Sequence, residues 1–145
     1  MRLYRRFSLR ILGLDYGSKT VGVAMTDPMG ITVQPFKTIL RDRESKLRKT
    51  LSEIQKIVED YDVEKIVVGL PLNMDDTEGE RAQETRTFVE KLKLRVTVPV
   101  EFTDERLTTM EAAEILDESG IKRSEQKRVI DQVAAQLILE QYLRG

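Results

Sequence analysis

The chain has 145 residues, of which 40% are hydrophobic and 34% are charged, a composition typical of one folded domain. It contains no cysteine, histidine or tryptophan, which excludes disulfide scaffolds, Cys/His zinc sites, thiol nucleophiles and catalysis by histidine. Lysine and arginine number 24 against 25 acidic residues, so the net charge of -1 does not by itself indicate a nucleic-acid-binding protein.

The ends of the chain bear on location and on partners. Residues 1–17 are basic and then apolar, but they lack the small-residue cleavage site of a signal peptide. No apolar run approaches the ~18 residues that span a membrane, and no Pro/Gly/Ser-rich linker divides the chain. We therefore expect a cytoplasmic protein without membrane contact, folded as a single domain over residues 1–145. Positive charge gathers at residues 1–10 and 122–128, either as solvated surface or as contacts for an anionic partner.

The predicted elements alternate in a defined order. Apolar and β-branched runs at 10–16, 20–26 and 31–40 are separated by tight-turn sequences and predict three antiparallel strands. Apolar residues from Leu47 to Tyr61 recur at helical spacing, and 65–69 has the composition of a buried strand parallel to the first. A helix to about Leu94, a strand at 99–103, a helix from Thr108 to Gly120 and a helix at about 125–143 follow. This order predicts an α/β fold, a mixed five-stranded sheet flanked by helices.

Acidic residues appear in three places where the apolar pattern does not call for them. Asp15 ends the first predicted strand, Asp104 and Glu105 follow the last one, and Asp131 shares the apolar face of the final helix. An ionised carboxylate buried without a partner is strongly unfavourable, so Asp131 needs a cation, strong hydrogen-bond donors or a raised pKa. Each acid also has a purely structural explanation. Asp15 could cap a turn, and Asp104 or Glu105 could interact with the N-terminus of the following helix. Asp131 could form a salt bridge to Arg106 or Arg128.

Clustered carboxylates suit metal-dependent chemistry. Two divalent ions ~4 Å apart can hydrolyse a phosphodiester without any histidine, and carboxylates are the ligands that such ions need. Phosphodiester hydrolysis is therefore compatible with this composition, although sequence spacing does not by itself bring the acids together.

Four ordered motifs carry a resemblance that spans nearly the whole chain. They are 13–17 with 21–24, 68–74, 104–109 with 111–112, and Asp131 with 134–135 and 138–139. With these motifs the chain resembles the bacterial YqgF family, a Holliday junction resolvase-like and pre-16S ribosomal RNA nuclease group of the RNase H-like superfamily. The resemblance implies an RNase H-like fold, in agreement with the predicted order of elements.

The resemblance also implies an active site. Asp15, Glu105 and Asp131 would be catalytic and would bind one or two Mg²⁺ or Mn²⁺ ions. Asp104 would replace or assist Glu105, and Arg106 would contact a phosphate or order the acids.

Nucleic-acid contacts are expected from four residues outside the acidic set, namely Lys19, Asn73, Lys127 and Arg128. The family usually has glycine where Asp76 stands, so Asp75 and Asp76 add negative charge beside the expected phosphate-binding surface.

The function that the resemblance implies is that of a two-metal endonuclease, and we favour 5′-end maturation of precursor 16S ribosomal RNA. The partners would be structured RNA and ribosomal precursor particles, or branched DNA for a Holliday junction resolvase of recombination and repair. Symmetric junction cleavage needs a dimer, and no surface in the sequence predicts one, so we expect a monomer or weak dimer. Two alternatives stay open: a non-catalytic nucleic-acid-binding module, and an ATPase, which 145 residues disfavour because such enzymes use two domains.

Overall fold

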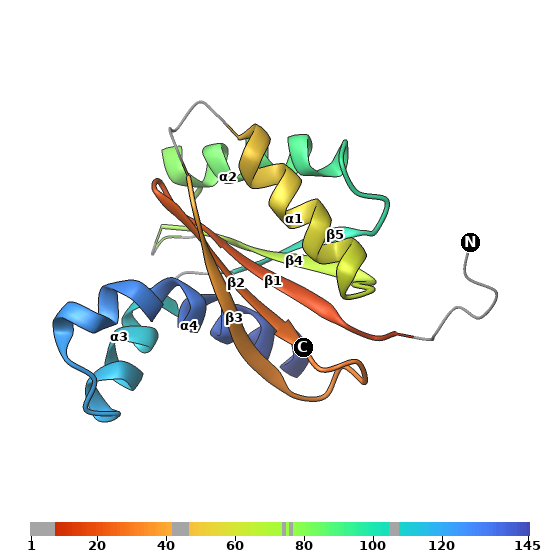
Figure 1. Cartoon of the computed structure of the whole chain (residues 1–145). Coiled ribbons are helices and arrows are strands. Elements are labelled where there is room, and N and C mark those ends of the chain that lie inside the picture. Colours follow the sequence, from red (N-terminus) through yellow and green to blue (C-terminus); the bar gives the residue numbers. More distant parts are fainter. Residues whose placement is uncertain (1–7, 42–46, 74, 76, 105–107) are drawn as a thin grey trace.

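The computed structural model describes residues 8–41, 47–73, 75, 77–104 and 108–145, with the backbone alone for 108–111, 123, 127 and 128. Five strands form one mixed sheet in the order β3-β2-β1-β4-β5, with helices on both faces (Figure 1). The elements are β1 (Ile11–Tyr16), β2 (Thr20–Thr26), β3 (Val33–Leu40), α1 (Arg48–Asp60), β4 (Lys65–Leu70), α2 (Glu80–Lys93), β5 (Val100–Asp104), α3 (Thr108–Glu118) and α4 (Arg123–Arg144).

The pairing of the strands confirms the predicted topology. Strands β1, β2 and β3 are antiparallel neighbours, and β4 and β5 pair in parallel on the other side of β1. Observed boundaries differ from the predicted ones by a few residues; β3, for example, begins at Val33 rather than at Ile31. Gly120 has a left-handed backbone conformation with a φ of 76°. The N–H of Ile121 donates to the Leu116 carbonyl, so this glycine follows α3 as predicted.

Helices α1 and α2 cover one face of the sheet and enclose the larger hydrophobic cluster (Figure 1). Alternate residues of β1 point into this cluster, among them Leu14 and Tyr16. The ring of Tyr16 stacks on that of Phe88 from α2, with centroids 4.1 Å apart. The cluster therefore fixes the position of α2 at the end of β1.

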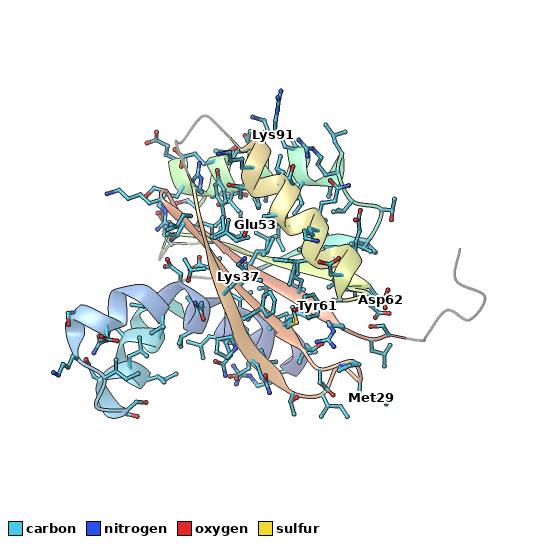
Figure 2. The ribbon with its side chains drawn as sticks, in the orientation of Figure 1. Met29, Lys37, Glu53, Tyr61, Asp62 and Lys91 are labelled. Atoms are coloured by element: carbon cyan, nitrogen blue, oxygen red, sulfur yellow. The ribbon has the colours of Figure 1, made fainter. Side chains whose placement is uncertain are left out.

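Strand β3 forms one edge of the sheet and is held to α1 by polar and aromatic contacts. Lys37 Nζ lies 2.7 Å from Glu53 Oε1, and Figure 2 shows where the two side chains lie between the strand and the helix. The rings of Phe36 and Tyr61 meet edge to face at 5.1 Å. Pro35 has no N–H to donate, which an edge strand tolerates.

Helix α4 packs on the opposite face of the sheet, with α3 beside it (Figure 1). Its residues Ala135, Ile138 and Leu139 form a second hydrophobic cluster with Ile11 and Val67 of the sheet. Within the part of the chain that the structure describes, no helix has both the length and the apolar character needed to cross a bilayer.

Candidate active site

Strand β1 and helix α4 bring two of the predicted acids, Asp15 and Asp131, to one cleft. The cleft has a volume of about 630 Å³ and lies between the β1–β2 turn, the start of α2 and the middle of α4. Its other described lining residues are Tyr16, Gly17, Ser18, Lys19, Thr20, Glu80, Arg81 and Glu84. The structure therefore places Asp15 and Asp131 on the wall of one cleft.

Asp15 faces α4 because side chains alternate along a strand. Leu14 and Tyr16 point into the α1/α2 cluster, so Asp15 between them points to the opposite face. Only 6% of Asp15 is exposed, although it carries a carboxylate. Asp15 pairs across the ladder with Gly22 of β2, which places this acid beside the strand that α4 contacts most closely.

Gly22 allows α4 to approach the sheet at Asp131. A Cβ added to Gly22 would lie 2.0 Å from the Asp131 carbonyl oxygen and 2.8 Å from its Cβ, which leaves room for glycine alone. The hydroxyl of Thr20 donates a hydrogen bond to Oδ2 of Asp131. Ala134 and Ala135 are buried on the same helix and Asp131 itself is half-buried, which confirms that Asp131 shares the face that meets the sheet.

Asp104 is the last residue of β5, and alternation along the strand places it on the α1/α2 side of the sheet. It has the parity of Phe102, which packs toward the α1/α2 cluster, whereas Glu101 contacts Tyr142 of α4. Among the described residues that line the cleft, Asp104 does not appear. The assisting role of Asp104 stays a prediction, and Glu105 and Arg106 lie outside the described residues.

The predicted nucleic-acid contacts fall in different places. Lys19 is exposed on the β1–β2 turn and lines the cleft. Asn73 instead serves its own loop, because its Nδ2 donates to Thr77 Oγ1 at 2.9 Å, and it is not among the described residues that line the cleft. Lys127 and Arg128 belong to the part of α4 that precedes Asp131, and their side chains lie outside the described part of the chain.

The β4–α2 loop is closed by its own polar groups. Asp75 Oδ1 accepts hydrogen bonds from the backbone N–H of Thr77 at 3.1 Å and from its hydroxyl at 2.6 Å. Glu78 pairs with Arg86 through two hydrogen bonds, and this pairing holds the pKa of the Glu78 carboxyl below its ordinary value. Asp75 therefore has a structural partner within the loop, while Asp76 lies outside the described residues.

Sequence reasoning did not find the role of Thr20 or the contribution of α2. Thr20, Gly22 and Ala24 alternate along β2, and a signal existed in these small side chains, which allow close packing of a helix on one face. Glu80 and Glu84 stand one turn apart at the start of α2 and reach the cleft together. Their position follows from the rule that sites form at the carboxyl ends of strands, where the following helix begins.

The donor atoms in the cleft suit a hard cation. The carboxylates of Asp15 and Asp131 and the hydroxyl of Thr20 present oxygen ligands, which Mg²⁺ and Mn²⁺ prefer. Within the described ranges, no three Asp, Glu, His or Cys side chains are grouped so that they could hold a metal ion. The chemistry of the two acids thus fits a divalent ion, and the third predicted ligand, Glu105, lies outside those ranges.

A solved structure has a similar fold. The chain is similar to T. thermophilus RuvC in complex with Holliday junction substrate, with a TM-score of 0.57 over 94% of this chain and 96% of that one. The sequence identity is 12%, so this likeness concerns the fold alone. The protein has the RNase H-like fold, with an acidic cleft at the carboxyl end of its first strand.

Comparison of the amino-acid sequence with known families and proteins identifies the family of this chain. The model of the RuvX family, described as Holliday junction resolvase, matches residues 9–145. Curated relatives include a Lachnospira eligens protein, 55% identical over 94% of this chain and 98% of its own length, and a Lactobacillus johnsonii protein, 52% identical over 94% and 96%. Both are named "Putative pre-16S rRNA nuclease". The chain belongs to the RuvX family, also called YqgF, which confirms the resemblance found in its motifs.

Proposed function

We propose that this protein is a divalent-metal-dependent endonuclease that hydrolyses phosphodiester bonds in the cleft between β1 and α4. The observation that carries the proposal is the meeting of Asp15 and Asp131, from elements far apart in the chain, in one cleft whose polar lining also includes Lys19. The names of its curated relatives support the same class of reaction.

Each residue has a separate task in this proposal. Asp15, Asp131 and Glu105 would hold Mg²⁺ or Mn²⁺, and when bound such ions activate water and stabilise the leaving oxygen. Thr20 orients the carboxylate of Asp131 through its hydrogen bond. Lys19, exposed at the mouth of the cleft, binds a phosphate of the substrate. Glu105 is preferred to Asp104 as the third ligand because Asp104 has the parity of Phe102 and points toward the α1/α2 face.

The substrate that we favour is the 5′-extended precursor of 16S ribosomal RNA. Its support is the name of the relatives at 55% and 52% identity. Acting on such a substrate, the protein would work in the cytoplasm as a single domain, as a monomer or weak dimer, on RNA alone or in ribosomal precursor particles. The description of the family model favours a second candidate, resolution of four-way DNA junctions.

One experiment tests both candidates. Wild type and Asp131→Asn are incubated with a 5′-extended 16S precursor RNA and with a four-way DNA junction, in the presence of Mg²⁺ or Mn²⁺. Loss of one metal-binding carboxylate should lower the cleavage rate by orders of magnitude while the circular dichroism spectrum stays unchanged. The substrate that the wild type cleaves faster identifies the function.

The matched control is Glu125→Gln, which removes one negative charge from an exposed position on the same helix. It should cleave at the wild-type rate. Equal rates for Asp131→Asn and wild type would show that the acidic cleft is not the active site, and no cleavage by a folded, metal-loaded wild type would favour the non-catalytic binding module.

A further inference from the structure

A second cavity, of about 340 Å³, adjoins the acidic cleft and shares part of its wall. The shared residues are Tyr16, Ser18, Glu80 and Glu84. Side chains at the end of β1, in the β1–β2 turn and in the first turns of α2 therefore separate the cavity from the acidic cleft. The volume falls at the lower end of the range of about 300–1,000 Å³ for pockets that hold small molecules. A group the size of one nucleotide therefore has room beside the site of proposed cleavage.

Helix α2 supplies one whole side of this cavity. The residues at i, i+3, i+4, i+7 and i+11 face it because they fall on one side of a helix, and they are Glu80, Gln83, Glu84, Thr87 and Lys91. The two glutamates stand at the end that borders the acidic cleft, and Lys91 stands about 16 Å further along the helix axis. Figure 2 shows Lys91 at the outer edge of the helical layer, near the start of α1.

The opposite wall is rigid and aromatic. The Tyr16 ring lies between the ring of Phe88, 4.1 Å away, and the guanidinium of Arg41, whose Cζ is 4.5 Å from the Tyr16 centroid. Arg41 also donates a hydrogen bond to the carbonyl of Gly17, which fixes it to the turn beside Asp15. A wall held by stacking and by a hydrogen bond costs little ordering when a ligand binds.

The chemistry of the lining changes along the cavity. Near the cleft it offers carboxylates, which accept hydrogen bonds from the amino groups of nucleobases. In the middle, the Gln83 amide donates through Nε2 to Glu78 at 3.3 Å, and the Thr87 hydroxyl donates to the Gln83 carbonyl at 3.1 Å. The oxygen atoms of both side chains can still accept hydrogen bonds from a ligand. At the far end the ammonium of Lys91 suits a phosphate. A nucleotide fits this arrangement if its base lies in the part of the cavity nearer the cleft and its phosphate lies at the far end.

We propose that the cavity is a nucleotide subsite, which holds a nucleotide adjacent to the one at the acidic cleft, with its base at Gln83 and Thr87 and its phosphate at Lys91. This inference rests on the proposed function in one respect only, that the strand entering the cleft is a nucleic acid. The subsite would make the protein sensitive to the identity of a base beside the cleaved bond.

The first test compares two lysines on one helix. A short single-stranded RNA is titrated with metal chelated, over a series of salt concentrations, into full-length wild type, Lys91→Gln and Lys93→Gln. Lys93 is also exposed on α2 but does not line the cavity. Loss of one phosphate contact should make the slope of log K against log salt shallower by about 0.7 in Lys91→Gln. Lys93→Gln should keep the wild-type slope.

The second test fills the cavity with Gln83→Trp, a change at an exposed position that should leave the fold intact, as circular dichroism can verify. A nucleoside 5′-monophosphate is titrated into wild type and variant, and the backbone amide signals of Thr87 and Lys91 are followed by NMR. Saturable shifts are expected in the wild type and none in the variant.

The two arms separate this inference from the proposed function. Both titrations measure binding and neither requires cleavage. A protein that gives the expected salt slopes and NMR shifts but cleaves no substrate would contradict the nuclease proposal and support the subsite. Equal salt slopes for Lys91→Gln and Lys93→Gln, together with the same mononucleotide response in wild type and Gln83→Trp, would overturn the subsite even in an active nuclease.

Discussion

Thr20 donates its hydroxyl to the carboxylate of Asp131, a residue 111 positions further along the chain. The bond ties the start of β2 to the middle of α4, at the point where Gly22 lets the helix touch the sheet. Because Asp15 pairs with Gly22 across the β1–β2 ladder, this single contact also fixes the relation of Asp131 to Asp15. The geometry of the proposed metal site therefore depends on a residue that need not bind the metal.

Thr20→Val should lower the cleavage rate about 10-fold or more, since a hydrogen bond to a charged group contributes about 1.5–3 kcal/mol and valine keeps the shape without the donor. Steady-state kinetics over a range of Mg²⁺ concentrations measures the effect. If the Asp131 carboxylate is less well oriented in the variant, it should bind Mg²⁺ more weakly, and half-maximal activity should need a higher Mg²⁺ concentration. Thr20→Ser retains the hydroxyl and should recover most of the rate. A fully active valine variant would mean that the bond does not orient Asp131.

Gly22→Ala should destabilise the fold, because the added methyl group would overlap the Asp131 backbone at 2.0 Å. We expect a loss of about 1–3 kcal/mol or more in the free energy of unfolding, measured by urea denaturation. Gly79→Ala is the control, since a Cβ there would meet the Asn73 side chain at an ordinary 3.5 Å. The two variants losing equal stability would contradict the close approach of α4 to β2.

Asp15→Asn should respond differently from wild type to metal. Asp15 is buried in the same cleft as Asp131, so without metal the neutral amide removes charge repulsion and should raise the midpoint of thermal unfolding. Mg²⁺ at 100 times its Kd should stabilise wild type by about 2.7 kcal/mol and the variant by less. Thermal unfolding in chelator and in Mg²⁺ gives both comparisons, and an identical Mg²⁺ response would exclude Asp15 as a ligand.

Glu101→Gln should lose stability in a pH-dependent way. Tyr142 donates its hydroxyl to Glu101, and Lys65 Nζ lies 3.3 Å from the same carboxylate, so these contacts hold the pKa of Glu101 below its ordinary 4.5. Stabilisation from a lowered pKa is complete above the ordinary value and is lost as the pH falls through the lower, folded-state value. The variant should therefore unfold at lower urea than wild type at neutral pH.

The difference between the two urea midpoints should shrink as the pH falls below 4.5. Glu90→Gln, at an exposed position on α2, serves as the control and should follow the wild type throughout. If the difference between the urea midpoints of wild type and Glu101→Gln stays constant with pH, the charge of the Glu101 carboxylate does not stabilise the contact between β5 and α4.

Local patterns were sufficient to predict most of the fold. The helical spacing from Leu47 to Tyr61 predicts α1, and the uninterrupted apolar run that begins at Lys65 predicts a buried strand beside β1. These features depend on residues close together in the chain. Boundaries were less accurate, because the first residue of β3 depends on its pairing with β2, where Val33 meets Thr26.

The site was predictable only in part, for a physical reason. Asp15 and Asp131 stood out because each is an acid on an apolar face, a property visible within one element. The orientation of Asp104 depends on which face β5 turns toward α4, and the partner of Asp131 depends on how α4 lies across β2. Such relations arise from packing between distant segments, which the spacing of residues along the chain does not record.

The order in which the site is assembled has a consequence for the cell. Since Asp131 and one wall of the cleft come from α4, a growing polypeptide that has folded β1, β2 and β3 still lacks half of the acidic pair. Proteins are made from the N-terminus at about 5–20 residues per second, so the 111 positions that separate Thr20 from Asp131 impose a delay of several seconds. An RNA-cutting protein built in this way would emerge from the ribosome harmless to the RNA around it, and would become active only after α4 has docked.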